Sequence, residues 1–208
     1  SINLLSADDI EEQWQKALSL HELGNLGEAS TIYQELLKLV PLDGTILNSY
    51  GTLLYQQQDI FLGFHYIRKS IIADPGIAIF YNRIGVVEKA GGDALKAARA
   101  FKRALMIKSE YEPNLNLCEL FLEQGQPKEA LEPAQKAVAI APENWVARLR
   151  LAAVSRLTGR NSEAVSEAEE AVSLNPLSHH CYQELSLANM AAEKGSLAFN
   201  AISKSILL

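Results

Sequence analysis

Residues 44–77 read GTILNSYGTLLYQQQDIFLGFHYIRKSIIADPGI, and this stretch decides the fold because its pattern recurs along the chain. A proline stands near the end of most copies, at Pro41, Pro75, Pro142 and Pro176, with Ser109 where one more would fall. Successive members of this series are 34, 34, 33 and 34 residues apart. A fixed period of this length indicates a repeat architecture, in which one small unit is stacked several times.

Two columns of small residues run through the repeat when each proline is numbered as position 32 of its unit. Small side chains at a crossing let two helices approach closely, so we expect each unit to be a pair of crossing helices. The twelve residues are Ala17, Gly51, Gly85, Cys118, Ala152 and Ser186 at position 8, and Ala29, Gly63, Ala97, Ala130, Ala164 and Ala198 at position 20.

Each unit contains two amphipathic segments of about a dozen residues, and no segment alternates as a strand would. In residues 44–77, for example, Leu47, Tyr50 and Leu54 fall at helical spacing. The proline at position 32 disfavours helix in the residue before it and so ends the second helix. We expect the turn between the helices to supply a capping side chain, namely Asn25, Asp59, Asp93 or Asn161, and Pro127 to begin its helix instead. The predicted fold class is all-α.

The pattern resembles the tetratricopeptide repeat. Residues 44–77 match it with Leu47, Tyr50-Gly51, Leu54, Gln58-Asp59, Gly63, Ser70 and Pro75, and residues 78–110 with Tyr81, Ile84-Gly85, Gly92-Asp93, Ala97, Phe101 and Ala104. Other units depart from it at Gln13, Lys16 and Arg148, and the last unit shifts its glycine to Gly195. The resemblance implies a single right-handed superhelical solenoid over residues 1–208, with about six helix-turn-helix repeats at 10–43, 44–77, 78–110, 111–144, 145–178 and 179–208.

The resemblance also implies that the first helix of each unit lines a concave groove. The candidate peptide-binding residues are Trp14, Asn48, Tyr55, Asn82, Arg83, Lys89, Asn116, Glu119 and Arg150. They could form an ordinary solvated inner wall, but asparagine amides can pair with the backbone of any peptide, and tryptophan and tyrosine add apolar area with a polar tip. We favour the groove. In this family, a carboxylate clamp for chaperone tails needs Lys and Asn in its first repeat, but Trp14 and Leu18 stand at those positions, so we do not expect this activity. An asparagine ladder like that of protein O-linked N-acetylglucosamine transferases needs Asn at position 6 of each repeat, and only Asn116 meets this.

The charge balance of the chain excludes some classes of binding partner. The chain has 19 Lys and Arg against 25 Asp and Glu, a net charge of −6, which argues against nucleic acid and anionic membranes. There is no signal peptide and no apolar stretch long enough to span a bilayer, so we expect a cytoplasmic protein without membrane insertion. A local basic excess lies at Lys96, Arg99, Lys102, Arg103 and Lys108, which is either a solvated face or a docking site for an acidic partner.

Chemistry-bearing motifs are not found. Neither phosphate-binding glycine motif occurs, and Cys118 stands at a packing position rather than as a reactive thiol. His179-His180-Cys181 could suggest a metal, but adjacent residues of a helix point apart, and capping by Ser178 gives a plainer interpretation. We therefore expect no cofactor, no metal and no enzyme activity within these residues.

Two functions compete. The first is a scaffold that binds an extended peptide or a partner helix of another protein in the groove. The second is recruitment of substrates to a larger enzyme, because Leu23-Gly24-Asn25-Leu26-Gly27-Glu28-Ala29 resembles arrays that precede bacterial protein glycosyltransferase domains. The chain begins with Ser1 and ends in Leu208, and we expect an excised or processed piece. The apolar end at Ile202 and 206–208 predicts a cover over the last helix, such as a homodimer mate.

Overall fold

The structure is a computed structural model that describes residues 6–193 and 195–207, so that Leu208 and residues 1–5 named above lie outside it. Every regular element in the described residues is an α-helix. The helices are α1 (Ala7–Glu22), α2 (Leu26–Leu39), α3 (Gly44–Gln56), α4 (Ile60–Ala73), α5 (Ala78–Ala90), α6 (Ala94–Ile107), α7 (Tyr111–Glu123), α8 (Pro127–Ile140), α9 (Trp145–Leu157), α10 (Asn161–Leu174), α11 (His179–Ala191) and α12 (Gly195–Leu207).

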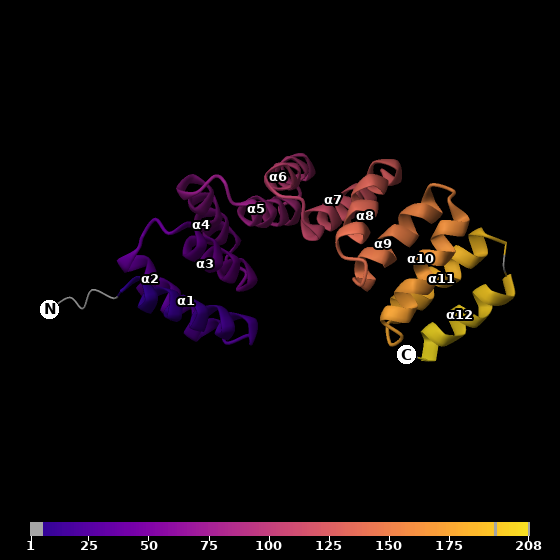
Figure 1. Ribbon diagram of the computed structural model, residues 1–208, viewed down its shortest axis with the longest axis horizontal. Helices are drawn as coiled ribbons and strands as arrows, with labels where there is room; N and C mark the ends of the chain where they lie inside the picture. The colour runs from indigo at the N-terminus through magenta and orange to yellow at the C-terminus, as the bar shows by residue number, and fades with distance from the viewer. Residues whose placement is uncertain (1–5, 194, 208) are drawn as a thin grey trace. The chain divides into compact units, whose positions relative to one another are not determined.

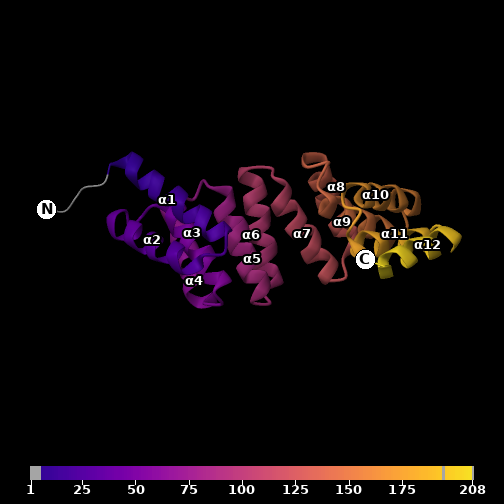
Figure 2. The ribbon, with the colours of Figure 1, turned by 90° about the horizontal axis from the view of Figure 1, so that it is seen from below.

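The helices form two compact units, Ser1–Ile107 and Lys108–Leu208, each built from three consecutive hairpins (Figures 1 and 2). In unit 1, α1 packs on α2, α3 on α4 and α5 on α6, while α2 and α4 each contact the first helix of the next hairpin. The first helices also contact one another, α1 with α3 and α3 with α5. Unit 2 repeats this scheme with α7 to α12. The predicted all-α fold of stacked helical hairpins is confirmed, and a single domain over 1–208 stays a prediction.

The small columns lie where the sequence placed them, at the crossing inside each hairpin. In the α3–α4 crossing, a Cβ atom on Gly51 would lie 2.8 Å from Cγ1 of Ile67 and 2.9 Å from the backbone oxygen of Gly63. In unit 2 the same contacts use slightly larger residues, and Cys118 and Ala130 are both fully buried. Close approach of the two backbones therefore explains why these columns exclude bulk.

The turn inside each hairpin uses one residue with left-handed backbone. Glycine takes this place in four hairpins, while Gln58 (φ 68°) and Glu193 (φ 60°) take it in the other two. In the first five hairpins the following N–H donates to the carbonyl five residues back, as from Asp59 to Leu54 at 2.9 Å. The left-handed residue of the last hairpin is thus Glu193, and Gly195 begins α12 instead of marking a shifted turn.

Helix ends follow the prolines, and the caps follow the prediction in part. The second helices end two residues before Pro41, Pro75, Pro142 and Pro176, and α6 ends two residues before Ser109. Asp59 and Asp93 accept hydrogen bonds from the helix that follows them, and α8 begins at Pro127. Two predicted caps are wrong. Asn25 makes no side-chain cap, and Asn161 lies inside α10, where its amide donates to the carbonyl of Ala191 at 2.8 Å.

Candidate functional site

A groove of about 690 Å³ lies along the first helices of unit 1. Its walls come from α1, α3 and α5 and from the short segment that leads into α5. The lining residues are Trp14, Leu18, His21, Glu22, Gly24, Leu26, Thr45, Asn48, Ser49, Thr52, Gln56, Ile77, Ile79, Phe80 and Arg83. Three of the predicted residues, Trp14, Asn48 and Arg83, are therefore brought together in one groove.

Two polar groups of the groove have nothing to bind within the described part of the chain. Asn48 is 6% exposed, and its amide nitrogen Nδ2 is buried without a hydrogen-bond partner. Arg83 is half-buried and forms no hydrogen bond or ion pair with any described residue. Leaving a buried N–H unpaired costs about 1–3 kcal/mol, so a turn of the Asn48 amide that gave Nδ2 an acceptor from outside would be favourable.

Neutral hydrogen bonds link the first two hairpins beside these groups. The indole Nε1 of Trp14 donates to Oγ of Ser49 at 3.2 Å, which holds the ring in the wall of the groove. Nε2 of His21 and Oε1 of Gln56 are 2.8 Å apart, again between α1 and α3. The remaining lining is mixed, with apolar side chains such as Ile77, which is 37% exposed, beside Thr45, Thr52 and the acidic Glu22. The groove thus offers apolar surface, a donor amide, one arginine and one carboxylate.

The structure places the other predicted residues of unit 1 elsewhere. Asn82 is 1% exposed and already has an interaction partner, so its side chain is buried where α5 packs against its neighbours. Tyr55 and Lys89 are half-buried and are not among the residues that line the groove. Sequence reasoning missed Ile77 and Phe80, because neither stands at a position that repeats on the inner face of a first helix.

The inner wall of unit 2 is bridged by charges. Nε of Arg150 donates to Oε1 of Glu119 at 2.9 Å, which joins α9 to α7. Arg156 donates twice to Glu184, at 2.7 and 3.2 Å, which joins α9 to α11. Two smaller hollows of about 280 and 340 Å³ lie here, and Arg150 lines both. Asn116 is half-buried and has a partner.

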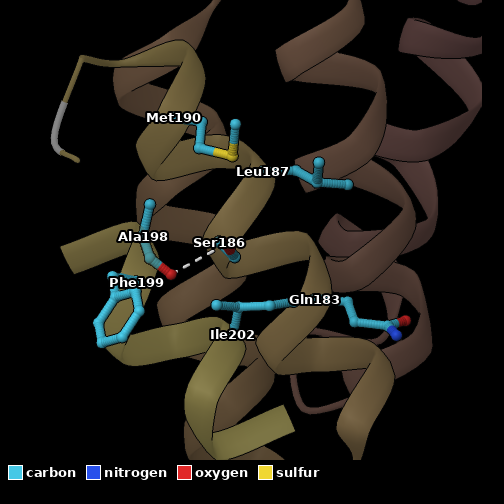
Figure 3. Close-up of a pocket in the computed structure, with 7 residues that line it drawn as sticks. All are labelled: Gln183, Ser186, Leu187, Met190, Ala198, Phe199 and Ile202. Carbon is cyan, nitrogen blue, oxygen red and sulfur yellow. Dashed lines mark hydrogen bonds between the residues drawn. The ribbon is translucent and has the colours of Figure 1, made fainter. Parts of the chain in front are cut away.

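A separate apolar hollow of about 630 Å³ lies on the last hairpin, between α11 and α12 (Figure 3). Phe199 is 70% exposed there, whereas Val165, at the same repeat position one hairpin earlier, is 5% exposed beneath α11. Inside the hairpin, Oγ of Ser186 donates to the carbonyl of Ala198 at 2.9 Å, the bond drawn in Figure 3. The face that is covered by α11 in the preceding hairpin is therefore exposed in the last hairpin.

Reactive groups are few in the described residues. Burial raises the pKa of the Cys118 thiol to about 12 and also raises the pKa of Cys181, so both thiols stay protonated at neutral pH. Within residues 6–193 and 195–207, no cluster of three or more His, Cys, Asp or Glu side chains could hold a metal ion. None of the helices described has the length and apolar character needed to cross a bilayer.

Comparison with known proteins agrees with this architecture. Residues 121–183 match the family model described as tetratricopeptide repeat. The human protein O-mannosyl-transferase TMTC1 is 30% identical over 125 residues, which is 60% of this chain. The chain spans only 14% of the length of that protein.

Solved structures show the same fold at low sequence identity. PilF of Pseudomonas aeruginosa superposes with a TM-score of 0.83 at 14% identity, over 92% of this chain and 88% of that one. PilW, a type IV pilus biogenesis factor, gives 0.81 at 17% identity, over 94% and 91%. YrrB, described as a tetratricopeptide-repeat protein with an unusual peptide-binding site, gives 0.71 at 19% identity, over 84% and 90%. Residues 121–183 thus match the tetratricopeptide repeat by sequence, and the stacked hairpins share the fold of these solved structures.

Proposed function

We propose that this chain is a protein-interaction scaffold and that the groove of unit 1 binds an extended peptide of another protein. The observation that carries the proposal is the pair of unpartnered groups in the groove wall, the buried amide of Asn48 and the guanidinium of Arg83. Tight polar recognition usually depends on a few well-placed groups within a mostly apolar pocket. This groove has that composition.

The chemistry of the two groups defines the ligand. The amide N–H of Asn48 needs an acceptor, and a peptide backbone carbonyl supplies one whatever the sequence of the peptide. Arg83 suits a carboxylate, because its planar fork can donate two parallel hydrogen bonds. Trp14 and Ile77 offer apolar surface for a side chain between these points. The proposed ligand is therefore an extended peptide with one acidic group and a neighbouring apolar side chain.

Selection from a displayed library of random 12-residue peptides, followed by affinity measurement on the whole chain, tests this proposal. Arg83→Ala and Asn48→Leu should each weaken the selected peptides by about 10-fold or more, since anchoring groups dominate interface energy. Lys128→Ala removes one positive charge from the exposed face of α8, outside the groove, and serves as the control. Affinities that survive Arg83→Ala and Asn48→Leu, with circular dichroism unchanged, would contradict the groove.

For the other predicted groove residues, contact with the peptide stays a prediction. Tyr55, Lys89 and Asn82 lie in unit 1 outside the groove lining, and Asn116, Glu119 and Arg150 lie in unit 2. Alanine at Tyr55 or Lys89 tests whether the bound peptide extends beyond the lining residues. A change of less than about twofold would confine the site to Trp14, Asn48 and Arg83.

A second candidate function is recruitment of substrates to a protein-modifying enzyme. It is favoured by the 125-residue likeness to a protein O-mannosyl-transferase, although the chain spans 14% of that protein. In this case the groove would hold the protein to be glycosylated. Reading the gene beyond residue 208 separates the two functions, since a glycosyltransferase domain would favour recruitment and its absence would leave the scaffold.

The last hairpin suggests a partner of its own. We infer that the apolar hollow beside Phe199 and Ile202 is covered by a second copy of the chain, because α12 carries a single charged residue, Lys204, and two such faces meet without repulsion. Analytical ultracentrifugation tests the inference. Phe199→Glu should convert a dimer to a monomer, and a monomeric parent chain would refute the pairing.

A further inference from the structure

The outer face of unit 1 carries four large apolar side chains at matching places on α4 and α6. Phe61 and Leu95 both stand at position 18 of their repeats and are 83% and 63% exposed. Ile72 and Met106 both stand at position 29 and are 77% and 76% exposed. Positions eleven residues apart lie on one side of a helix, about 16 Å from each other. Each helix therefore has an exposed apolar side chain near both of its ends.

Between these apolar ends lies a basic middle. Positions 22 and 25 hold His65 and Arg68 on α4, and Arg99 and Lys102 on α6, and all four are exposed. These positions fall on the same stripe as the apolar ends, because side chains three or four apart share a helix face. The sequences of α4 and α6 contain no Asp or Glu. Each stripe thus reads apolar, basic, basic, apolar.

Packing of the hairpins does not require this pattern. The same four exposed positions are polar or small on the other second helices whose side chains are fully described. They are Gly27, Thr31, Gln34 and Lys38 on α2, Lys128, Glu132, Gln135 and Ala139 on α8, and Ser162, Ser166, Glu169 and Ser173 on α10. Exposed apolar residues that recur in register around charges mark an interaction site more often than a chance surface.

The basic residues of α4 and α6 outnumber the two acidic residues that precede these helices. Asp93 precedes α6 and pairs with Lys96 at 2.8 Å, and its pKa is lowered mainly by its hydrogen bonds with Lys96 and in part by the charge of Arg99. Asp59 precedes α4 and caps it by accepting from the N–H of Leu62. Arg68 lies over an aromatic ring, 5.7 Å from the centroid of Phe64. Stacking of this kind holds a guanidinium in place while its N–H groups remain able to donate.

We propose that the outer face of α4 and α6 is a second docking surface, which binds an acidic segment of a partner protein. Carboxylates of the segment lie over Arg68, Arg99 and Lys102, and apolar side chains at its two ends contact the Phe61–Leu95 and Ile72–Met106 pairs. A protein segment fits better than a membrane, because a helix that enters a bilayer surface gathers its apolar residues on one face instead of separating them by cations. This surface is independent of the groove, since it shares no residue with it.

A defined probe tests this surface on the whole chain. The probe is a fluorescein-labelled peptide with two leucines at each end and five glutamates between them, and its control has glutamines in place of glutamates. Fluorescence anisotropy should show binding of the acidic peptide that weakens at high salt, while the glutamine peptide binds much less. No measurable binding of the acidic peptide at low salt would overturn the proposal.

Matched charge reversals separate a specific surface from general attraction. Arg99→Glu with Lys102→Glu should weaken the acidic peptide by about 10-fold or more, while Lys128→Glu with Lys136→Glu, the same change of charge on α8, should alter it by less than about twofold. Phe61→Ser with Met106→Ser should weaken it by about threefold or more. Equal losses in the α6 and α8 variants would refute the surface. Sedimentation with phosphatidylserine–phosphatidylcholine vesicles that the α6 reversal abolishes, without peptide binding, would assign the face to a membrane instead.

Discussion

The inner walls of the two units are built from the same repeat positions but are held together differently. In unit 1, neutral hydrogen bonds join α1 to α3, and Arg83 at position 6 has no partner among the described residues. In unit 2, position 6 holds Arg150 and Glu184, and each forms an ion pair with the preceding hairpin. At this position a side chain either lacks a partner within the described residues or braces two hairpins, depending on whether the facing helix supplies the opposite charge.

The crossings inside the hairpins differ in part as well. Unit 1 has alanine at Ala17, Ala29 and Ala97, but glycine at Gly51, Gly63 and Gly85, where even a methyl group would collide with the facing helix. Unit 2 uses residues with a Cβ atom, such as Ala152 and Ala164, which are fully buried. Unit 1 therefore gains closer packing at positions that tolerate no substitution.

The largest effect concerns the cysteines, which lie only in unit 2 and so report on that unit alone. Because burial raises the pKa of Cys118 to about 12, we expect Ellman's reagent at pH 8 to label the native thiol about 1000-fold more slowly than the unfolded one. Above about pH 9 the thiol of the unfolded chain loses its proton, while the buried thiol of the folded chain keeps it. This ionisation stabilises the unfolded state relative to the folded state. The free energy of unfolding should accordingly fall as the pH rises from about 9 towards 12. Rapid labelling without denaturant would show that unit 2 opens readily.

The crossing of unit 1 should respond strongly to one methyl group. Gly51→Ala is expected to lower the free energy of unfolding by about 2–3 kcal/mol, because the added Cβ meets the backbone of α4. Gly27→Ala, where nothing lies within 4 Å, should instead stabilise α2 by about 0.5 kcal/mol. Urea unfolding followed through Trp14 fluorescence measures both. Similar values for the two variants would mean that the crossing is looser than described.

The ion pairs of unit 2 should matter more than the neutral contacts of unit 1. The side chain of Glu184 is 11% exposed, and Glu184→Gln should destabilise unit 2 by about 2 kcal/mol, since it leaves Arg156 without its charged partner. Ser49→Ala, which removes the bond to Trp14, should cost about 0.5–1 kcal/mol. The double replacement Arg156→Met with Glu184→Leu should recover most of the loss, because it leaves no unpaired charge. Urea unfolding followed through Trp145 fluorescence measures the first and third changes.

The smallest effect is at the turns. Gln58 has a left-handed backbone, so Gln58→Gly should stabilise unit 1 by about 0.5–1 kcal/mol. Gln57, the preceding residue, has a φ of −75°, and Gln57→Gly should give no gain. Thermal unfolding by circular dichroism compares the two. A gain at both positions would indicate that the effect comes from the unfolded chain instead of the turn.

The fold could be predicted from sequence because its determinants are local and repeated. The columns at positions 8 and 20 and the prolines at position 32 each impose one requirement, close helix crossing or helix ending, and the structure meets both. Turn chemistry was predicted less well. Asn25 stands at the N-cap of α2 but its side chain makes no capping hydrogen bond, and Asn161 is one residue past the N-cap Arg160, as the first residue of α10.

The candidate site could be predicted only in part, because its members depend on side-chain surroundings. Asn48 and Asn82 stand at the same repeat position, yet Asn48 lines the groove and Asn82 is 1% exposed with a partner. The pairing of Glu119 with Arg150 depends on residues 31 apart, which the repeat pattern does not relate by charge. Periodicity identifies the face of a helix, whereas neighbours decide what each side chain on that face does.

Contacts inside each unit are confined to near neighbours, since a helix touches only helices one or two places away along the chain. In such a unit, no contact between helices that are distant in sequence has to break before unfolding can begin. Under mechanical tension a three-hairpin unit should yield from its ends, hairpin by hairpin, and each 34-residue release would lengthen the tether by about 110 Å. A protein anchored at one unit and loaded at the other would therefore stretch in steps, as an extensible spacer between the molecules it joins.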